Sequence, residues 1–234
     1  MSLNFLIFFF VFFEFASQTL QAQHIRGEDF LKQVHGKYFK GPCRYYSFSQ
    51  RNKHYRNDSL IRTSEWHEAI GFPDQFRIHF GDKAKGNFVW FRNDSALNYR
   101  DGKFLKARSD SNSLLLILGG MFYRDFEDVL LRLKAAGYNT TTLCEKNWMG
   151  KPVYVLGARE NDENANQIWF DKENLRVLRI IENLSAIEQM DMRFEKLQTW
   201  CHGYMETKVS FRRNGKLEQE EEYYNIKEEE RFPD

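Results

Sequence analysis

The sequence has few of the residues that mark specialised classes of protein. Only three cysteines, four prolines and 14 glycines occur among 234 residues. The low proline and glycine content excludes fibrous and low-complexity chains. Charges nearly balance, at 34 Lys and Arg against 33 Asp and Glu, so the basic excess of a nucleic-acid-binding protein is missing. A hydrophobic content of 42% is enough to build a core, which excludes an acidic disordered chain.

The three cysteines, Cys43, Cys144 and Cys201, are far apart in the sequence and form no CxxC pair. Zinc-finger and thioredoxin-type sites therefore have no support. One disulfide with one free thiol fits an oxidising compartment, and three buried thiols fit equally well. In both cases the cysteines are too few for a disulfide scaffold, so a hydrophobic core must hold the domain.

Aromatic residues are in excess, at 16% of the chain, and 22 of them are phenylalanines. Seven of these phenylalanines lie in the first 15 residues, where Phe5 to Phe13 form a continuous apolar run. The run is too short to span a bilayer and fits the apolar region of a secretory signal. Leu20-Gln21-Ala22 resembles a signal-peptidase site. We therefore expect a signal peptide over residues 1–22, export to the periplasm, and one mature domain over residues 23–234. A buried N-terminal helix is the alternative.

The hydrophobic pattern of the mature chain predicts an α+β fold. Helical spacing predicts a helix from Ile25 to about Gly36 and a second one over Met121 to Ala136. The segments between and after these helices alternate apolar and polar residues, as antiparallel strands do. Asp101-Gly102 and Asn214-Gly215 are strong hairpin signals. We expect about 11 strands in one curved, meandering antiparallel sheet, an unclosed β-barrel with an N-terminal helix and a central helical lid.

Known catalytic motifs are absent from the sequence, which contains no GxSxG, P-loop or GxGxxG. His67-Glu68 lacks the second histidine of an HExxH zinc site, so no metal site and no cofactor is predicted. An enzyme that uses His67, His79 and Glu65 on neighbouring strands is one alternative, and surface histidines are the other. Four N-x-S/T sequons, at Asn57, Asn93, Asn139 and Asn183, would matter only in a eukaryotic secretory host.

Large apolar side chains are more numerous than a plain sheet needs. If they lie on the concave side of a curved sheet under the central helix, they either pack solidly or enclose an apolar cavity. The candidate ligand-binding residues are Phe76, Ile78, Phe80, Phe88, Trp90, Phe122, Phe126, Leu130, Val153, Val155, Ile168 and Phe170. The candidate lid is Leu114 to Ala136, with Gly119 and Gly120 as its hinge.

One stretch of the C-terminal half resembles a known family. The segment from Gly150 to Ala158, followed by Ile168-Trp169-Phe170-Asp171, is similar to the strand, turn and I-W-x-D hairpin of the LolA-like outer-membrane lipoprotein carriers. Leu175 to Arg179 continues the match. The N-terminal strands, with Trp66-His67-Glu68 and Trp90, do not follow the family pattern, which favours a relative that binds another hydrophobic ligand.

The resemblance implies an exported, non-enzymatic protein without a cofactor. Its partners would be lipid or lipoprotein acyl chains, bound in the concave face of a half-barrel, with transient membrane contact and no nucleic acid. The chain would be a monomer. Two alternatives remain open: an envelope protein-interaction module with a solid core, and a hydrolase or metal enzyme built on His67, His79 and Glu65.

Overall fold

The computed structural model describes residues 26–41, 43–162, 164–201 and 203–233. The predicted signal peptide, residues 1–22, lies outside these described residues. The N-terminal helix α1 spans Gly27–Tyr38 and so continues past Gly36, where we expected it to end. Gly36 lies on the exposed side of the helix, where a Cβ would meet no atom within 4 Å, so the chain has no steric reason to turn there.

One antiparallel sheet of 13 strands makes up most of the described chain. The N-terminal strands are β1 (Tyr45–Arg56), β2 (Ser59–Gly71), β3 (Gln75–Phe80), β4 (Phe88–Arg92), β5 (Ser95–Arg100) and β6 (Lys103–Ser109). The C-terminal strands are β7 (Leu143–Trp148), β8 (Lys151–Leu156), β9 (Gln167–Asp171), β10 (Val177–Asn183), β11 (Gln189–Trp200), β12 (Gly203–Arg213) and β13 (Lys216–Glu228). A short 3-10 helix, η1 (Lys83–Lys85), lies between β3 and β4.

The expected count of about 11 strands is therefore too low. Two-residue turns with positive φ at Asn57-Asp58, Asn93-Asp94 and Asp101-Gly102 each separate two strands of the N-terminal half. Such turns let adjacent strands pair with almost no connecting loop, so the N-terminal half accommodates six strands.

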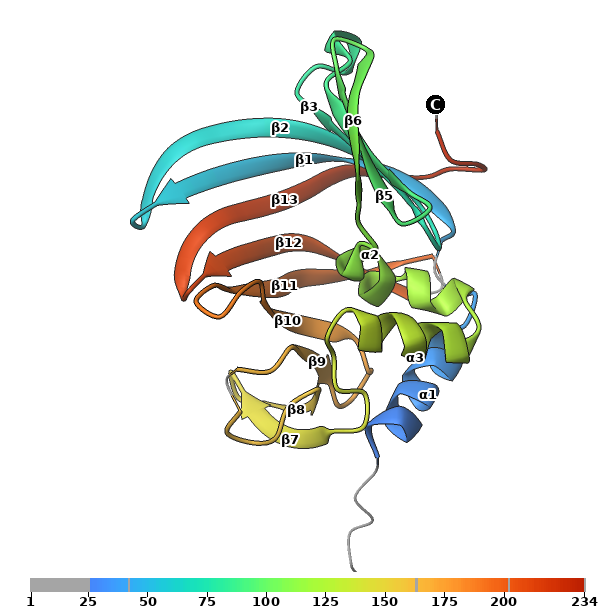
Figure 1. The fold of residues 1–234 in the computed structure, drawn as a ribbon, viewed down its shortest axis with the longest axis vertical. Helices are drawn as coiled ribbons and strands as arrows, with labels where there is room; N and C mark the ends of the chain where they lie inside the picture. The colour runs from blue at the N-terminus through green and yellow to red at the C-terminus, as the bar shows by residue number, and fades with distance from the viewer. Residues whose placement is uncertain (1–25, 42, 163, 202, 234) are drawn as a thin grey trace, which may run out of the picture.

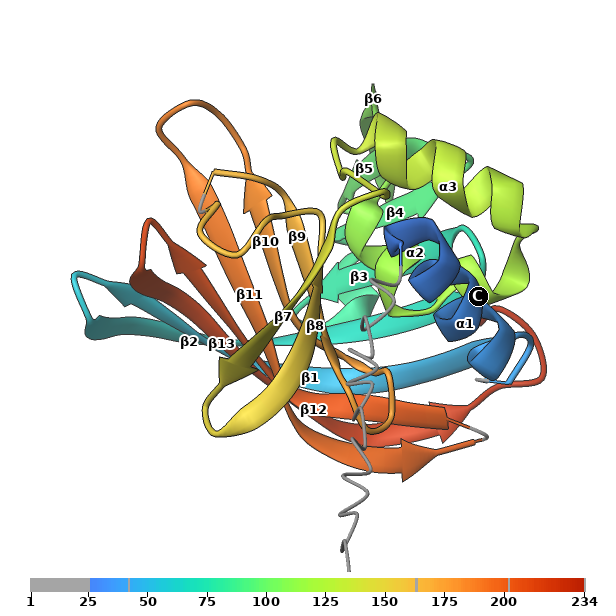
Figure 2. The same cartoon turned by 90° about the horizontal axis from the view of Figure 1, so that it is seen from below.

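The strand order is β6-β5-β4-β3-β2-β1-β13-β12-β11-β10-β9-β8-β7. Two meanders are thus joined where β1 pairs with β13, and β6 and β7 form the two edges. The sheet is curved and unclosed, as the sequence predicts, and the helices gather on one side of it (Figure 1 and Figure 2). We call the face toward the helices the concave face and the opposite face the outer face.

The central helical block is divided into three pieces, α2 (Ser113–Leu118), the 3-10 helix η2 (Gly120–Tyr123) and α3 (Phe126–Ala135). The expected continuous helix over Met121 to Ala136 is wrong because Arg124 and Asp125 have extended backbones. The Asn112 side chain accepts a hydrogen bond from the Leu115 amide at 2.9 Å and begins α2. No helix in the described part of the chain is both long and apolar enough to cross a membrane.

The main hydrophobic core lies between the helices and the concave face. It joins α1, α2, η2 and α3 to β8–β12, and its most enclosed residues are Phe30, Leu31, Val34, Ile117, Met121, Val129, Leu133, Leu156, Ile168, Phe170, Ile180 and Val209. A second cluster, Val153, Val155, Ala158, Trp169, Leu178 and Ile181, covers the outer face. Alternation along β8 and β9 sends successive side chains to the two clusters.

Candidate functional site

A cavity lies between the helices and the concave face and has a volume of about 80 Å³. The helix layer contributes Val34 and Tyr38 of α1, Ile117 and Leu118 of α2, and Phe122 of η2. The sheet contributes Tyr46, Phe170, Val177, Leu197, Trp200, Gly203, Tyr204, Met205 and Glu206, and the remaining lining residues are Cys43, Phe72, Leu175 and Arg176. Most of this lining is apolar, so the cavity suits an aliphatic or aromatic group.

Polar side chains occur at one side of the cavity. The Arg176 guanidinium lies 4.2 Å from the centre of the Tyr204 ring, which is 47% exposed. This cation–π contact keeps Arg176 beside the cavity. The Tyr38 hydroxyl donates a hydrogen bond to the backbone carbonyl of Asn174, which ties α1 to the β9–β10 turn. The cavity therefore combines apolar walls with a small polar opening.

Three carboxyl groups are enclosed on the concave face. Glu206 lines the cavity, and Glu68 and Glu221 are buried on β2 and β13. Burial, with a smaller contribution from the charge of Glu221, raises the pKa of Glu206 to about 7. Burial also raises the pKa of Glu68 and of Glu221 above the usual range for a carboxyl.

Hydrogen bonds partly compensate Glu221, which accepts one from Tyr223 at 2.7 Å and one from Gln219 at 2.6 Å. Among the described residues, none of the three carboxylates forms an ion pair with a Lys or Arg. Desolvation without a countercharge disfavours the ionised form. The floor of the concave face therefore becomes more apolar as the pH falls.

The structure brings together only some of the residues predicted to bind a ligand. Phe122 and Phe170 line the cavity. Leu130 and Ile168 are buried in the adjoining core, and Phe126 packs against it. Phe76, Ile78 and Phe80 lie at the concave side of β3, in register with Glu68 and its neighbours on β2, and do not line the cavity.

Four of the predicted residues point to the opposite side of the sheet, so the expectation of one shared concave surface is wrong for them. Val153 and Val155 belong to the outer cluster. Phe88 and Trp90 pair with His79 and Arg77, and these positions alternate with the concave Phe76, Ile78 and Phe80. Trp90 is also covered by Phe232, whose ring stacks on it at a centroid distance of 5.9 Å. For the other eight residues, contact with a ligand stays a prediction.

Sequence reasoning missed most of the cavity wall. Val34 and Tyr38 follow the helical apolar pattern of α1, but that pattern does not reveal which strands they face. Glu206 was missed because Lys196 has a positive φ, which places an irregularity in β11 opposite this part of β12. A charged residue in an otherwise amphipathic strand is the only sequence signal that Glu206 offers.

Gly119 separates α2 from η2, and Gly120 is the first residue of η2, as expected of a junction in the helical block. Both are buried, and a Cβ on Gly119 would lie 2.0 Å from the Phe72 ring. Gly119 therefore permits close packing against Phe72, and a hinge role for it remains a proposal.

Gly119→Ala is expected to lower the free energy of unfolding by about 1–3 kcal/mol, because the added methyl group must displace Phe72. Chemical denaturation measures the change. Gly36→Ala is the matched control, since its Cβ meets no atom within 4 Å and should stabilise α1 by about 0.5–1 kcal/mol. Equal effects of the two substitutions would contradict the packing role of Gly119.

The histidines of the alternative enzyme site lie on the outer face. His67 is paired with His79 across β2 and β3, and its Nε2 is 3.8 Å from Glu65 Oε1. Burial lowers the pKa of His79 to about 4. His67, His79 and Glu65 do not line the cavity between the helices and the concave face. These three side chains therefore lie on the opposite side of the sheet from the cavity.

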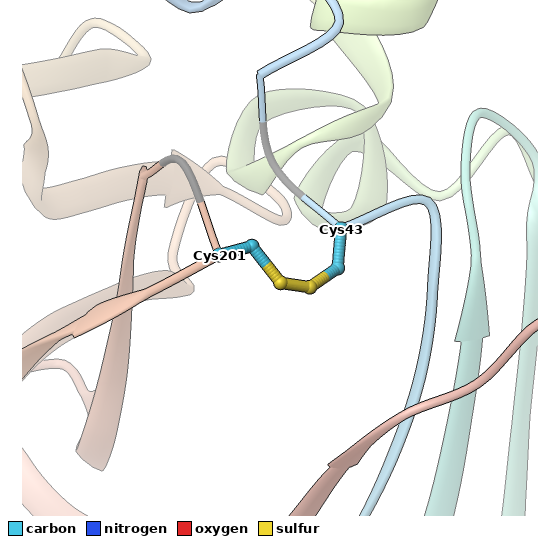
Figure 3. Close-up of a disulfide and its surroundings, with 2 residues drawn as sticks. All are labelled: Cys43 and Cys201. Atoms are coloured by element: carbon cyan, nitrogen blue, oxygen red, sulfur yellow. A yellow bond between two sulfur atoms is a disulfide. The ribbon is translucent and has the colours of Figure 1, made fainter.

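Cys43 and Cys201 form a disulfide (Figure 3) with a Cα–Cα distance of 5.6 Å. Cys144 is free. The pairing joins the segment after α1 to the β11–β12 turn, beside the cavity. With Glu228, the two cysteines are also the only group of three described residues spaced to hold a metal ion. In the disulfide the sulfur atoms are not available as thiolate ligands.

Solved structures with a similar fold are known, although the sequence itself matches no known family. A scan against models of protein families finds no match, and no curated protein matches the sequence. A DUF1329 family protein from Desulfovibrio piger is similar with a TM-score of 0.58 and 16% identity, over 89% of this chain and 94% of that one. A LolA superfamily protein from Nitrosomonas europaea is similar with a TM-score of 0.56 and 11% identity, over 86% and 94%.

A domain from Vibrio parahaemolyticus, described as an outer membrane lipoprotein-sorting protein, has a TM-score of 0.60 and 10% identity, over 89% of this chain and 94% of that one. At these identities the likeness concerns the fold. The resemblance inferred from the Ile168-Trp169-Phe170-Asp171 hairpin is therefore confirmed at that level: the chain has the unclosed, helix-covered half-barrel of LolA-like proteins.

Proposed function

We propose that the protein binds an apolar ligand, an acyl chain of a lipid or lipoprotein, between its helices and the concave face of its sheet. The observation that carries the proposal is the apolar cavity formed by α1, α2 and η2 over β9–β12. Burial of apolar ligand surface there would supply roughly 25 cal/mol per Å². The likeness to a lipoprotein-sorting domain supports the same class of ligand.

The cavity is too small to hold an acyl chain, so the structure would represent a closed state of the protein. Its volume of about 80 Å³ is well below the roughly 300–1,000 Å³ of common ligand pockets, so an acyl chain needs the helices to move outward. Binding would then select or induce an open state, in which the side chains between α2 and the strands separate.

One ion pair joins the helical block to the sheet, and two further ion pairs within the block share its residues. Arg132 of α3 binds Asp94 in the β4–β5 turn at 2.8 Å and Asp128 at 3.1 Å, and Arg124 binds Asp128 at 2.9 Å. These contacts are partly exposed, so each contributes little and can break without a large penalty. We infer that α2, η2 and α3 form the lid. The ion pair between Arg132 and Asp94 would break when the lid opens and form again when it closes.

Leu118→Trp tests the ligand site. Leu118 lines the cavity from α2, and the larger indole should fill it and lower affinity for a fluorescent fatty acid by at least about tenfold. Titration of the probe into purified mature protein measures the affinity. Native mass spectrometry of protein from its host identifies any lipid that co-purifies.

Leu131→Trp is the matched control, because Leu131 is 68% exposed on α3 and does not line the cavity. Its affinity should equal that of the unsubstituted protein. Unchanged binding by Leu118→Trp would contradict the site. Failure of the unsubstituted protein to bind the probe, together with no co-purifying lipid, would favour an envelope protein-interaction module with a solid core.

We also propose that the protein carries its ligand across the periplasm. It is supported by the predicted secretory signal over residues 1–22 and by the fold shared with a lipoprotein-sorting domain. The role needs no chemical reaction, because transfer of a ligand requires only two conformations with different affinities. The protein would act as a monomer that meets a membrane transiently to load and unload.

A further inference from the structure

Charge is divided unevenly along the chain. The β3–β6 unit, residues 75–109, contains eight Lys and Arg against three Asp, whereas the whole chain has 34 against 33. The same unit exposes three large apolar side chains, with Phe80 at 41%, Phe104 at 56% and Leu105 at 53%. Positive charge and exposed apolar surface therefore coincide in one part of the sheet.

These residues gather at one end of the unit, which we call the tip and define as residues 80–87 and 100–106. The Gly102 amide donates to the Gly86 carbonyl at 3.0 Å, and the Asp101 amide donates to Asn87 Oδ1 at 3.0 Å, so the two loops touch. Figure 1 shows this end of β3 and β6 projecting from the sheet, away from the helices. The charged side chains of the tip are Lys83, Lys85, Arg100, Lys103 and Lys106, with Asp82 and Asp101.

The positive charges of the tip are not neutralised within the protein. In the described part of the chain, none of its five Lys and Arg side chains forms an ion pair. Of the two acidic residues, Asp82 accepts a hydrogen bond from the Ala84 amide at 2.9 Å and caps η1. The tip thus presents an excess of exposed cations.

Protection of an edge strand explains only part of this pattern. Lysines on an edge strand prevent pairing with another chain, and β6 is an edge. That role would not place Phe104 and Leu105 in solvent, nor two further lysines in the β3–β4 loop. The other edge, β7, has one Glu and one Lys, and none of its apolar side chains is exposed.

We propose that the tip docks onto the surface of an anionic lipid bilayer. Phe80, Phe104 and Leu105 would enter the interfacial layer, while the lysines and Arg100 contact lipid phosphates, which is how basic segments with exposed apolar residues bind membranes. A projecting pair of loops suits a bilayer better than a protein partner, whose interface commonly covers about 800 Å² on each side. The tip residues do not line the cavity, so docking is independent of the proposed ligand.

Co-sedimentation with vesicles tests the docking. Full mature protein should bind phosphatidylcholine vesicles that contain phosphatidylglycerol, bind pure phosphatidylcholine at least tenfold more weakly, and lose affinity as salt is raised. Lys83→Glu with Lys103→Glu should reduce binding to the anionic vesicles by at least about tenfold. Phe104→Ser with Leu105→Ser should reduce it by a similar factor.

Exposed residues elsewhere provide matched controls. Lys32→Glu with Lys151→Glu repeats the charge change, and Leu131→Ser with Met149→Ser repeats the apolar change at side chains 68% and 76% exposed. Both controls should bind vesicles as the unsubstituted protein does. Equal loss in a control and a tip variant would overturn the proposal, as would an absence of binding to anionic vesicles or selective binding to an acidic protein instead. Circular dichroism confirms that each variant is folded.

Discussion

Replacing Phe170 with Ala is expected to lower the free energy of unfolding by about 3–5 kcal/mol. Phe170 is 1% exposed, and its ring packs edge-on against Phe30 at 5.2 Å between α1 and the sheet. The substitution removes this contact and leaves a void that joins the existing cavity. Urea unfolding followed by tryptophan fluorescence measures the change.

The enlarged cavity gives the same variant a second readout. If the apolar cavity is the ligand site, Phe170→Ala should bind a short fatty acid at least as tightly as the unsubstituted protein while it unfolds more easily. Phe104→Ala is the control, since Phe104 is 56% exposed and its loss should change stability by less than about 0.5 kcal/mol. A small effect at Phe170 would contradict its central place in the core.

The carboxyl of Glu206 is expected to contribute stability that is lost as the pH rises from about 4.5 to 7, and Glu206→Gln should remove this contribution. The pKa of Glu206 rises from 4.5 in the unfolded chain to about 7 in the folded protein. The folded state therefore binds more protons at Glu206 in this range, so the stabilising contribution of this carboxyl is greatest below pH 4.5 and declines until the pH passes 7. The shift corresponds to about 3 kcal/mol at pH 8.

Glutamine does not titrate, so the Glu206→Gln protein should lose less stability than the unsubstituted protein between pH 4.5 and pH 8. Denaturation curves at several pH values measure the difference. Glu127→Gln, at an exposed position of α3, should leave the pH dependence unchanged. Parallel pH profiles for the Glu206→Gln and unsubstituted proteins would show that this carboxyl is not held in the environment described above.

Much of the fold could be predicted because local patterns decide it. The β9 strand and the Asp101-Gly102 and Asn214-Gly215 turns occur where the sequence places them, since alternation and left-handed turn residues depend only on near neighbours. The hairpin that carries the family resemblance has a physical basis as well. Asp171 Oδ1 accepts hydrogen bonds from the Glu173 and Asn174 amides at 2.8 and 3.3 Å and closes the turn.

The site was harder to predict, because it depends on which face of each strand meets which helix. Val153 and Val155 are as apolar as Ile168 and Phe170, yet a shift of one position sends them to the outer cluster. Where both faces of a sheet are apolar, the sequence does not indicate which face is concave and meets the helices. The helical block is similarly hard to read, since the chain becomes extended at Arg124 and Asp125, neither of which is a helix-breaking residue.

The pairing of β1 with β13 has a consequence for how the chain folds. Tyr46 lies opposite Glu228, so the first strand of the sheet completes its hydrogen bonding with the last. Contacts of such long sequence separation form slowly, because the loop between them must be closed first. During synthesis, the two meanders cannot be joined until the final strand has emerged, so each must wait for β13 before the sheet becomes continuous.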